Sequence, residues 1–455
     1  MRHVTGVLEM VYALLQFFKV IPSFNRFYTY TGSFDNPAVF AMLLSVCVPV
    51  AVHFALRNRN SMLWWTAAAL MYVFIGCSES RSGLIAATVS SFWIYLSADE
   101  SLRRKLLSKR ILAIAVPVIL ALAVLLYLFK ADSANGRLLM WRVSFEMFLD
   151  RPLLGFGIDG FTSRYMQYQA DFFLNHPGSP FILLADNVNN PFNEFLNVLV
   201  NFGLVGLLAV LAVLSFTVRT LYKGNDEHRH LLTGLILTII VWCMFSYPLS
   251  VQFVWVTILF ILTAAFFTVL VNSRIVNLST SAACFVGIAA AIVCFIPQRE
   301  WKIISERSLA GQTEAVLPDY SRLEKNLGHN GKFLYNYGAE LHFSGHYNES
   351  LTVLDKCSLY LNDYDVQMLM ADCYQNIGDT LNAVGRYRAA SNMIPYKFLP
   401  LYNTMKLYIG QGDSLAAFNV ANEILSKQVK VERSKTVQRI IEEASTLVTS
   451  MTGSE

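Results

Sequence analysis

Two arginines stand out as residues suited to phosphate chemistry, because each lies in a short polar segment between apolar runs. Arg81 lies in SESRSGLIA at 78–86, and Arg137 lies in GRLLMW at 136–141. A guanidinium group contacts phosphate oxygens in a bidentate geometry that the lysine ammonium does not offer. Both are candidate phosphate ligands; an interfacial anchor is the simpler alternative for Arg81, and a solvated helix terminus for Arg137. Arg142 and Arg164 are secondary candidates, and Arg142 can equally pair with Glu146.

A literal G-x-G-x-x-G follows, formed by Gly155, Gly157 and Gly160. A dinucleotide-binding loop needs a strand before its first glycine and a helix after its last. Here residues 138–149 have the pattern of a helix, in which Arg142 and Glu146 pair at a spacing of four. Pro152 ends that helix, and the glycines allow a tight non-helical path. The motif therefore predicts a turn and not a nucleotide site.

Apolar helices must position these residues. The chain has 455 residues, of which 55% are hydrophobic and 15% charged, so much of it must face lipid. Runs of about 17–25 apolar residues can cross a bilayer core as helices. The sequence predicts an all-α protein, a polytopic bundle of about nine spans followed by a helical-repeat domain. The spans cover roughly residues 6–21, 38–56, 62–77, 84–97, 111–129, 197–217, 231–247, 250–271 and 280–296.

The distribution of basic residues predicts the orientation of the bundle. With a cytoplasmic N-terminus, the inside loops hold most of the loop lysines and arginines, and the short outside loops hold Arg26 and Arg81. Basic residues stay on the cytoplasmic side. Nine spans then place the loop 130–196 and the tail outside, and we predict domains at 1–296 and 297–455. The seven cysteines contain no C-x-x-C pair, which indicates neither a zinc site nor a disulfide framework.

The tail contains a repeat. Gly345, Gly378 and Gly412 are spaced 33 and 34 residues apart, in LHFSGHYNESL, CYQNIGDTLNA and LYIGQGDSLAA. A small residue follows each glycine by five positions: Ser350, Ala383 and Ala417. A 34-residue period with glycine at the turn between helices resembles tetratricopeptide repeats, and three such units can share a core. The repeats could bind a partner or an acceptor, or could only stabilise the chain.

Five segments resemble, in this order, the O-antigen ligase and polymerase superfamily of bacterial membrane glycosyltransferases. They are TGSFDNPAVFA at 31–41, SESRSGLIA, GRLLMW, DRPLLGFGIDGF at 150–161 and PFNEFLNVLVNFGLVGLL at 191–208. The resemblance covers about residues 30–215. It implies a multi-pass protein of the bacterial inner membrane, with the large loop and the tail in the periplasm. The glycine-rich segment then matches the D-x-P-L-L-G-x-G turn of the family's periplasmic loop.

The resemblance also implies a reaction, the transfer of a glycan from an undecaprenyl-pyrophosphate carrier to an acceptor hydroxyl. The pyrophosphate leaving group needs fixed cations, and Arg81 and Arg137 match the family's arginine positions. The partners implied are the polyprenyl-linked donor, a glycan, lipid or protein acceptor, and membrane lipid. A protein partner at the repeats is a further expectation. Neither nucleic acid nor any cofactor is expected. The loop contains no D-x-D motif, so a metal-assisted mechanism is not indicated.

The acceptor hydroxyl needs a base, and here the sequence departs from its relatives. Relatives commonly carry His-Asn before the next span, whereas this chain reads Phe192-Asn193-Glu194. Asn193 could orient a hydroxyl or a phosphate, and Glu194 could act as the base if burial favoured its proton uptake. Glu194 also suits the first turn of a helix without any catalytic role. His176 is a third candidate, against the alternative of a surface histidine.

We therefore expect an enzyme of the ligase type, with a repeat-unit polymerase and a protein O-oligosaccharyltransferase as alternatives that share the same motifs. A non-enzymatic membrane scaffold that recruits partners through its repeats would account for the missing histidine. A transporter would carry ionisable residues at mid-depth of the bilayer, where they are costly. The centres of the predicted spans are nearly free of such residues.

Overall fold

The computed structural model describes residues 2–58, 61–106, 131–223, 228–270, 295–431 and 434–452, with the single residues 108, 113, 117 and 127. No β-strand occurs among these residues, and the predicted all-α class is confirmed. The chain divides into two compact units. Unit 1 comprises 1–131, 192–195 and 207–277, and unit 2 comprises 132–191, 196–206 and 278–455.

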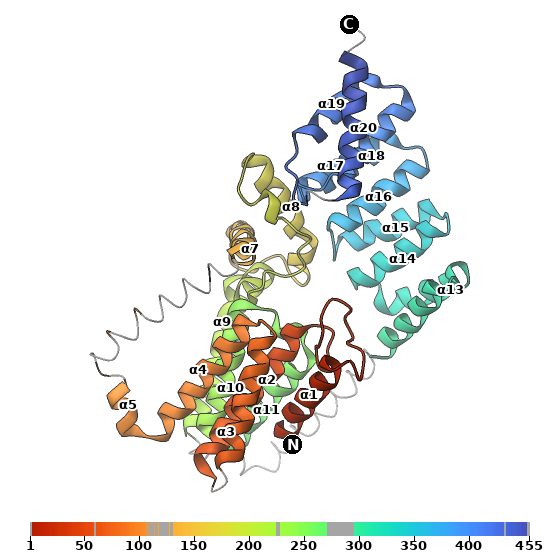
Figure 1. The fold of residues 1–455 in the computed structure, drawn as a ribbon. Helices are drawn as coiled ribbons and strands as arrows, with labels where there is room; N and C mark the ends of the chain where they lie inside the picture. The colour runs from red at the N-terminus through yellow and green to blue at the C-terminus, as the bar shows by residue number, and fades with distance from the viewer. Residues whose placement is uncertain are drawn as a thin grey trace. The chain divides into compact units, whose positions relative to one another are not determined.

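Unit 1 is a bundle of apolar helices (Figure 1). Helix α2 packs on α3 and α4, and α4 packs on α10. Close packing depends partly on small residues: an atom added at Gly83 of α4 would lie 3.3 Å from Ala41 of α2. The helices of this unit are α1 (Arg2–Phe17), α2 (Pro37–Arg57), α3 (Ser61–Cys77), α4 (Arg81–Ala98), α5 (Glu100–Leu106), α10 (Arg229–Phe245) and α11 (Gln252–Leu270), with a short 3-10 turn η2 (Pro248–Ser250).

Two described helices are long and apolar enough to cross a membrane, α2 and α9 (Glu194–Lys223). Shorter apolar helices coincide with four other predicted spans, at Thr5–Phe17, Ser61–Cys77, Arg229–Phe245 and Gln252–Ala265. The predicted span 111–129 and nearly all of 280–296 lie outside the described residues. The count of nine spans therefore stays a prediction.

Helix α9 is broken at Gly203, whose backbone has φ 62° and ψ −160°. The sequence predicts one uninterrupted span at 197–217, because the apolar run continues through the glycine. A helix break leaves backbone N–H and C=O groups without their usual partners. In this chain the glycine-rich segment supplies those partners, as described below.

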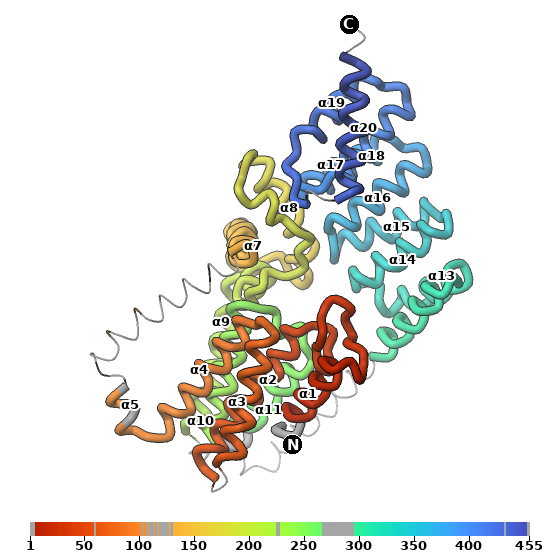
Figure 2. The backbone as a smooth tube through the Cα atoms, viewed as in Figure 1, coloured from red at the N-terminus to blue at the C-terminus, as the bar shows by residue number. Residues whose placement is uncertain are grey.

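Unit 2 joins the large loop to the repeat tail. The loop contributes α7 (Ala131–Asp150), α8 (Gly160–Asn175) and the 3-10 turn η1 (Ile182–Leu184). The tail contributes α13 (Thr313–Leu327), three helix pairs and α20 (Lys435–Thr452), which the smooth tube in Figure 2 follows as a continuous series. The pairs are α14 (Gly331–Phe343) with α15 (Tyr347–Ser358), α16 (Tyr364–Asn376) with α17 (Thr380–Met393), and α18 (Leu399–Gln411) with α19 (Ser414–Ser426).

The tail confirms the predicted repeat. Gly345, Gly378 and Gly412 lie at the turn within each pair with φ of 80°, 83° and 77°, a conformation that favours glycine. The three small residues that follow them by five positions, Ser350, Ala383 and Ala417, are fully buried. Ser350 Oγ donates to the carbonyl of Gly338 at 2.7 Å. Small side chains at these positions therefore allow the paired helices to cross closely.

The loop and the tail share one hydrophobic core. Phe161, Tyr165 and Phe172 of α8 are buried in the same cluster as Ala390 and Met393 of α17. The side chain of Gln169, which is fully buried, donates to the carbonyl oxygen of Met393 at 2.7 Å. The predicted boundary at 297 marks a change in composition, whereas the packing groups the loop with the tail.

Candidate functional site

Arg81 is the first residue of α4, and the structure explains why the helix begins there. Glu79 has φ 56°, which turns the chain, and Ser80 caps the helix by accepting a hydrogen bond from the Gly83 N–H at 3.2 Å. The Arg81 side chain is half-buried. Asn36 caps the neighbouring helix α2 by accepting from Ala38 N–H at 2.8 Å.

Glu194 is a buried carboxylate in the same unit. It opens α9, is 6% exposed, and its Oε1 accepts a hydrogen bond from the Leu249 N–H at 3.2 Å. Leu249 belongs to η2, the short turn between α10 and α11. A carboxylate at a helix N-terminus is favoured by the backbone dipoles, but burial of that carboxylate away from water is costly unless it is hydrogen-bonded. Glu194 is therefore held in place from a second element of the bundle.

Phe192, at the position where the family resemblance implies histidine, has φ 50°. A non-glycine residue in this left-handed region is uncommon and bears strain. Its ring packs edge-on against Tyr247, with centroids 5.4 Å apart. Tyr247 Oη in turn accepts a hydrogen bond from Asn36 Nδ2 at 3.2 Å. These contacts bring the Phe192–Phe195 segment to the cap of α2 and to the α10–α11 turn.

Tyr247 and Asn36 were not predicted as site residues. Asn36 lies in the segment 31–41, which carries part of the family resemblance, and this resemblance could have indicated Asn36 as a site residue. Nothing local in the sequence marks Tyr247, because its position depends on how α10 and α11 pack against 192–195.

Arg137 lies on α7 of unit 2 and is half-buried. Helix α7 begins at Ala131 and Arg137 lies in its second turn, so Arg137 is not at the helix terminus that the alternative interpretation of this residue requires. The predicted pair on this helix is confirmed: Arg142 Nε lies 3.5 Å from Glu146 Oε1. The helix ends at Asp150, two residues before Pro152. Leu139, Val143 and Met147 form its buried face.

Arg142 and His176 form a second cluster in unit 2. The His176 ring stacks on Phe172 with centroids 4.6 Å apart, and the guanidinium of Arg142 lies 4.8 Å above the same Phe172 ring. His176 Nδ1 lies 2.9 Å from the Phe172 carbonyl, and Nε2 lies 3.2 Å from Arg142 Nη2. A carbonyl only accepts, so Nδ1 carries the proton and Nε2 accepts from Arg142. Both ring nitrogens are therefore engaged, and the role of His176 as a base stays a prediction.

Arg164 lies on α8 and is exposed. Its guanidinium lies 5.4 Å from the ring centroid of Phe156, and that of Arg151 lies 5.0 Å from the same ring. Two guanidinium groups on one aromatic ring are each held there by cation–π attraction. Arg164 thus has a defined position, and its contact with phosphate stays a prediction, as do those of Arg137 and Arg142.

The glycine-rich segment docks onto the break in α9. Phe156 N–H donates to the Val200 carbonyl at 2.9 Å and Gly157 N–H to the Asn201 carbonyl at 2.8 Å. In return, the N–H groups of Leu204 and Val205 donate to the carbonyls of Pro152 and Leu153 at 2.8 and 3.2 Å. The amides that would cradle a phosphate in a nucleotide-binding loop are used for this docking instead.

Glycine is required on both sides of this contact. A side chain on Gly155 would lie 2.5 Å from the backbone of Asn201, and one on Gly203 would lie 2.3 Å from the backbone of Leu153. Both residues also have positive φ. Asn201 closes the junction, because its Oδ1 accepts from the Phe161 N–H at 2.9 Å. The segment that joins the two halves of α9 is therefore built by close backbone contact.

Among the described residues, no three His, Cys, Asp or Glu side chains are grouped so that they could share a metal ion. The structure therefore offers no cluster of this kind for a metal near the candidate residues that it describes.

Residues 66–211 match the family model described as O-Antigen ligase. The predicted resemblance is thereby confirmed, and the match supports a glycosyltransferase-like function in polysaccharide assembly and a membrane location. No curated protein matches the sequence. A solved structure described as the crystal structure of MamA protein is similar with 13% sequence identity and a TM-score of 0.28, over 33% of this chain and 87% of that chain.

Proposed function

We propose that the protein transfers a glycan from a polyprenyl-pyrophosphate carrier to an acceptor hydroxyl at the outer face of the bacterial inner membrane. The observation that carries the proposal is that the matched segment 66–211 contains every predicted site residue. These residues are Arg81, Arg137, Arg142, Arg164, His176, Asn193 and Glu194. A glycan donor and an acceptor are implied by the match in general terms, and the carrier and the class of acceptor are part of the proposal.

In the proposed reaction, the acceptor oxygen attacks the anomeric carbon of the donor glycan. The bond from that carbon to the pyrophosphate oxygen breaks, and the leaving pyrophosphate gains a negative charge. Arg81 and Arg137 stabilise that charge by hydrogen bonds to the phosphate oxygens. The hydroxyl proton passes to the Glu194 carboxylate, while Asn193 orients the hydroxyl.

The burial and the fixed position of Glu194 support its proposed role as the base. The Leu249 N–H donates to its Oε1, so a second element of the bundle holds the carboxylate in place. A base held in one rotamer by a neighbouring element loses little entropy when the hydroxyl binds. Phe192 cannot take a proton, so a carboxylate two residues later replaces the histidine of the relatives.

The test is a deletion strain complemented with wild type, Arg81→Ala, Arg137→Ala and the control Arg26→Ala. Arg26 is exposed and its guanidinium lies over Phe27, outside the matched segment. We expect each of the first two variants to lower transfer about 10²-fold at unchanged membrane abundance, while Arg26→Ala transfers normally. Surface polysaccharide and carrier-linked glycan are measured by gel and by lipid extraction.

The accumulated carrier-linked species identifies the subclass. Long unattached chains indicate a ligase, single repeat units indicate a polymerase, and loss of glycoproteins alone indicates a protein glycosyltransferase. If Arg81→Ala and Arg137→Ala both restore normal surface polysaccharide, the enzyme is excluded in favour of the scaffold.

A further inference from the structure

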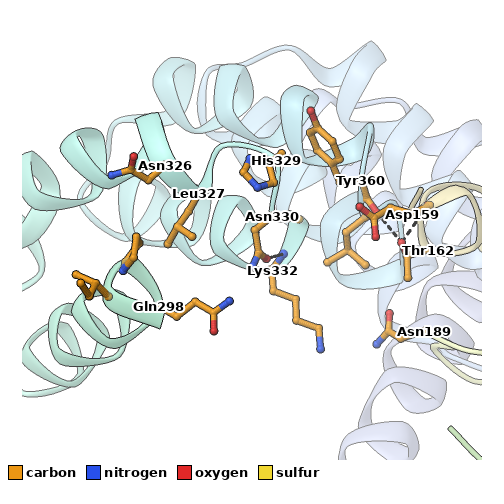
Figure 3. A pocket seen from close by; sticks show the side chains of 14 residues that line it. Asp159, Thr162, Asn189, Gln298, Asn326, Leu327, His329, Asn330, Lys332 and Tyr360 are labelled. Atoms are coloured by element: carbon orange, nitrogen blue, oxygen red, sulfur yellow. Dashed lines mark hydrogen bonds between the residues drawn. The ribbon is translucent and has the colours of Figure 1, made fainter. Parts of the chain in front are cut away.

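Unit 2 contains a cleft of about 690 Å³ that the predicted catalytic residues do not use. Its walls are the start of α8, the turn between α13 and α14, the turn at Tyr360–Leu361 and the helical segment 295–309. Figure 3 shows Gln298 and Asn189 on opposite sides of its open space, with the side chain of Lys332 extending into the space between them. Pockets of roughly 300–1,000 Å³ hold ligands of drug size, so a short oligosaccharide fits this volume.

Besides Tyr360 and the hydrogen-bonded Thr162 and Asn330, six polar side chains line the cleft: Asp159, Asn189, Gln298, Asn326, His329 and Lys332. Within the described part of the chain, none of these six side chains makes a hydrogen bond or an ion pair. Three of them are amides, and each amide offers a donor and an acceptor side by side. Their hydrogen-bonding capacity is thus available to a ligand.

The charge of the cleft favours a neutral ligand. One lysine and one aspartate oppose each other in sign among its lining residues, so no excess of cations recommends a phosphate or another anion. The half-buried Tyr360 contributes an aromatic side chain, which pairs an apolar ring with a polar tip. Amides beside an aromatic ring suit the hydroxyls and the apolar face of a sugar.

Hydrogen bonds between the loop and the tail fix the walls. Thr162 Oγ1 donates to the Tyr360 carbonyl at 2.7 Å, and Asn362 N–H donates to the Thr162 carbonyl at 3.1 Å. Nearby, Asn187 Nδ2 donates to Asp363 at 3.0 Å and to Asp365 at 2.9 Å. Because the walls are preorganised, little conformational entropy is lost when a ligand binds.

We infer that this cleft binds an oligosaccharide, a segment of the glycan handled by the enzyme, at a subsite formed jointly by the large loop and the first repeats. The inference rests on the proposed function, since it supplies a binding site for the sugar part of the donor or of the acceptor. A subsite remote from the anomeric carbon would bind donor or acceptor glycan by its sugar residues and not by its phosphate.

Binding is tested with the full-length protein in lipid nanodiscs. Two end-labelled probes are used. The donor probe is a set of fragments released by mild acid from the surface polysaccharide of the wild-type strain. The acceptor probe is the acceptor glycan isolated from a strain that does not make this polysaccharide. Gln298→Ala with Lys332→Ala removes two hydrogen-bonding side chains, and Lys325→Ala is the matched control on α13 outside the cleft. We expect the double variant to weaken Kd for one probe about tenfold or more, and the control to bind as wild type.

The probe that loses affinity identifies the source of the glycan. The inference is overturned if wild type binds neither probe, or if the double variant binds both with wild-type affinity. Both substituted side chains are exposed and make no hydrogen bond within the described chain, so the fold is retained. Arg81→Ala should bind the lipid-free fragments normally, which separates failure of this inference from failure of the proposed reaction.

Discussion

At the scale of single residues, the most informative position is Phe192. Its backbone occupies a left-handed conformation at φ 50°, in which histidine, asparagine and aspartate are better tolerated than phenylalanine. The buried Glu194 lies two residues later. The strain therefore lies where the family resemblance implies a histidine, and in the proposed reaction the carboxylate takes the place of that histidine.

Glu194→Gln tests the base. The amide keeps the shape of the side chain but cannot accept the hydroxyl proton, so we expect transfer to fall about 10²–10⁴-fold with normal membrane abundance. Transfer is measured by the release of unlinked carrier. Glu194→Asp serves as a comparison, because it keeps the carboxylate but withdraws it by one methylene, and it should retain partial activity.

The double variant Phe192→His, Glu194→Gln tests whether a histidine at position 192 can act as the base. Histidine suits the local backbone, so the double variant should fold and recover part of the lost transfer. Full activity in Glu194→Gln alone would remove Glu194 from the mechanism and leave Asn193 or His176 as candidates.

Residue-level prediction succeeded where partners are close in sequence. The Arg142–Glu146 pair follows from a spacing of four on a helix. The contact of His176 with Arg142 joins residues 34 positions apart and depends on how α7 packs against α8, which no local pattern encodes. The burial of Glu194 depends likewise on η2, a turn more than fifty residues away.

At the scale of elements, the break in α9 could not be predicted from the sequence. The run 197–217 is predominantly apolar and contains two glycines, Gly203 and Gly206; a glycine inside such a run does not distinguish a break from a smooth span. The break exists because the glycine-rich segment satisfies its backbone groups. Helix turns in the tail were more predictable, since the spacing of the three turn glycines repeats.

Gly203→Ala should separate this segment from α9. The added carbon meets the Leu153 backbone, and positive φ costs a non-glycine residue about 1–3 kcal/mol. We expect faster proteolytic cleavage within 151–158 and loss of transfer. Gly136→Ala is the control, because that glycine lies in α7 with no atom near an added carbon and alanine stabilises a helix.

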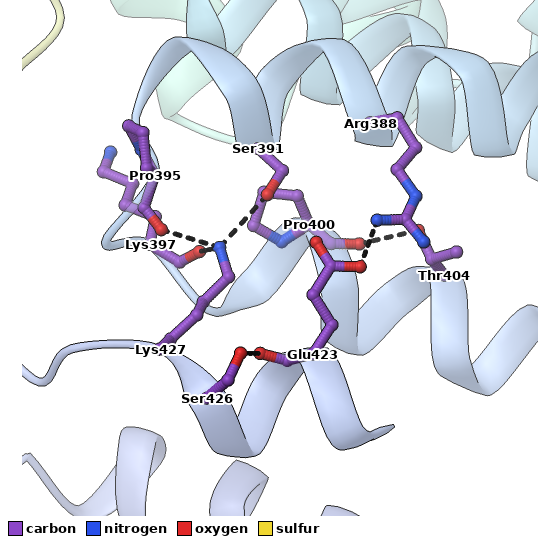
Figure 4. A network of polar contacts seen from close by, with 9 residues as sticks. All are labelled: Arg388, Ser391, Pro395, Lys397, Pro400, Thr404, Glu423, Ser426 and Lys427. Atoms are coloured by element: carbon purple, nitrogen blue, oxygen red, sulfur yellow. Dashed lines mark hydrogen bonds and ion pairs between the residues drawn. The ribbon is translucent and has the colours of Figure 1, made fainter. Parts of the chain in front are cut away.

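Lys427 shows how the last repeat pair is closed (Figure 4). Its Nζ donates to Ser391 Oγ, the Pro395 carbonyl and the Lys397 carbonyl at 3.1, 2.7 and 3.0 Å. Beside it, Arg388 forms an ion pair with Glu423. Burial lowers the pKa of Lys427 to about 8 from 10.5. The amine therefore links α19 to the turn between α17 and α18.

The lowered pKa predicts a pH dependence with a definite sign. The unfolded chain binds the Lys427 proton more tightly than the folded repeat does. The free energy of unfolding of the repeat is therefore largest above pH 10.5, and it falls as the pH falls from 10.5 to about 8. Hydrogen exchange of α18 and α19, corrected for intrinsic rates, should show protection that rises from pH 8 upward. Lys427→Met should abolish this rise; an unchanged slope in the variant would assign it to another group.

At the scale of the molecule, the large loop and the tail form one unit although the sequence changes composition between them. Phe172 and Phe173 of the loop are 2% and 6% exposed and lie in the core shared with α17. Composition could not reveal this, because the aromatic residues of a lipid interface and of a protein core are the same types. The repeats therefore contribute to the fold of the matched segment.

Truncation after residue 296 tests this dependence. It removes Tyr364, Ala390, Met393 and Ile394, which are buried against the loop, and it removes the acceptor of the Gln169 side chain. We expect the loop to open, with cleavage between 151 and 191 at least about tenfold faster and no detectable transfer. Truncation after residue 431 removes α20, which belongs to a different cluster with α18 and α19, and should leave the loop protected. A loop equally resistant in both truncations would mean that it folds without the tail, and the tail would then be an attachment to an independently folded loop.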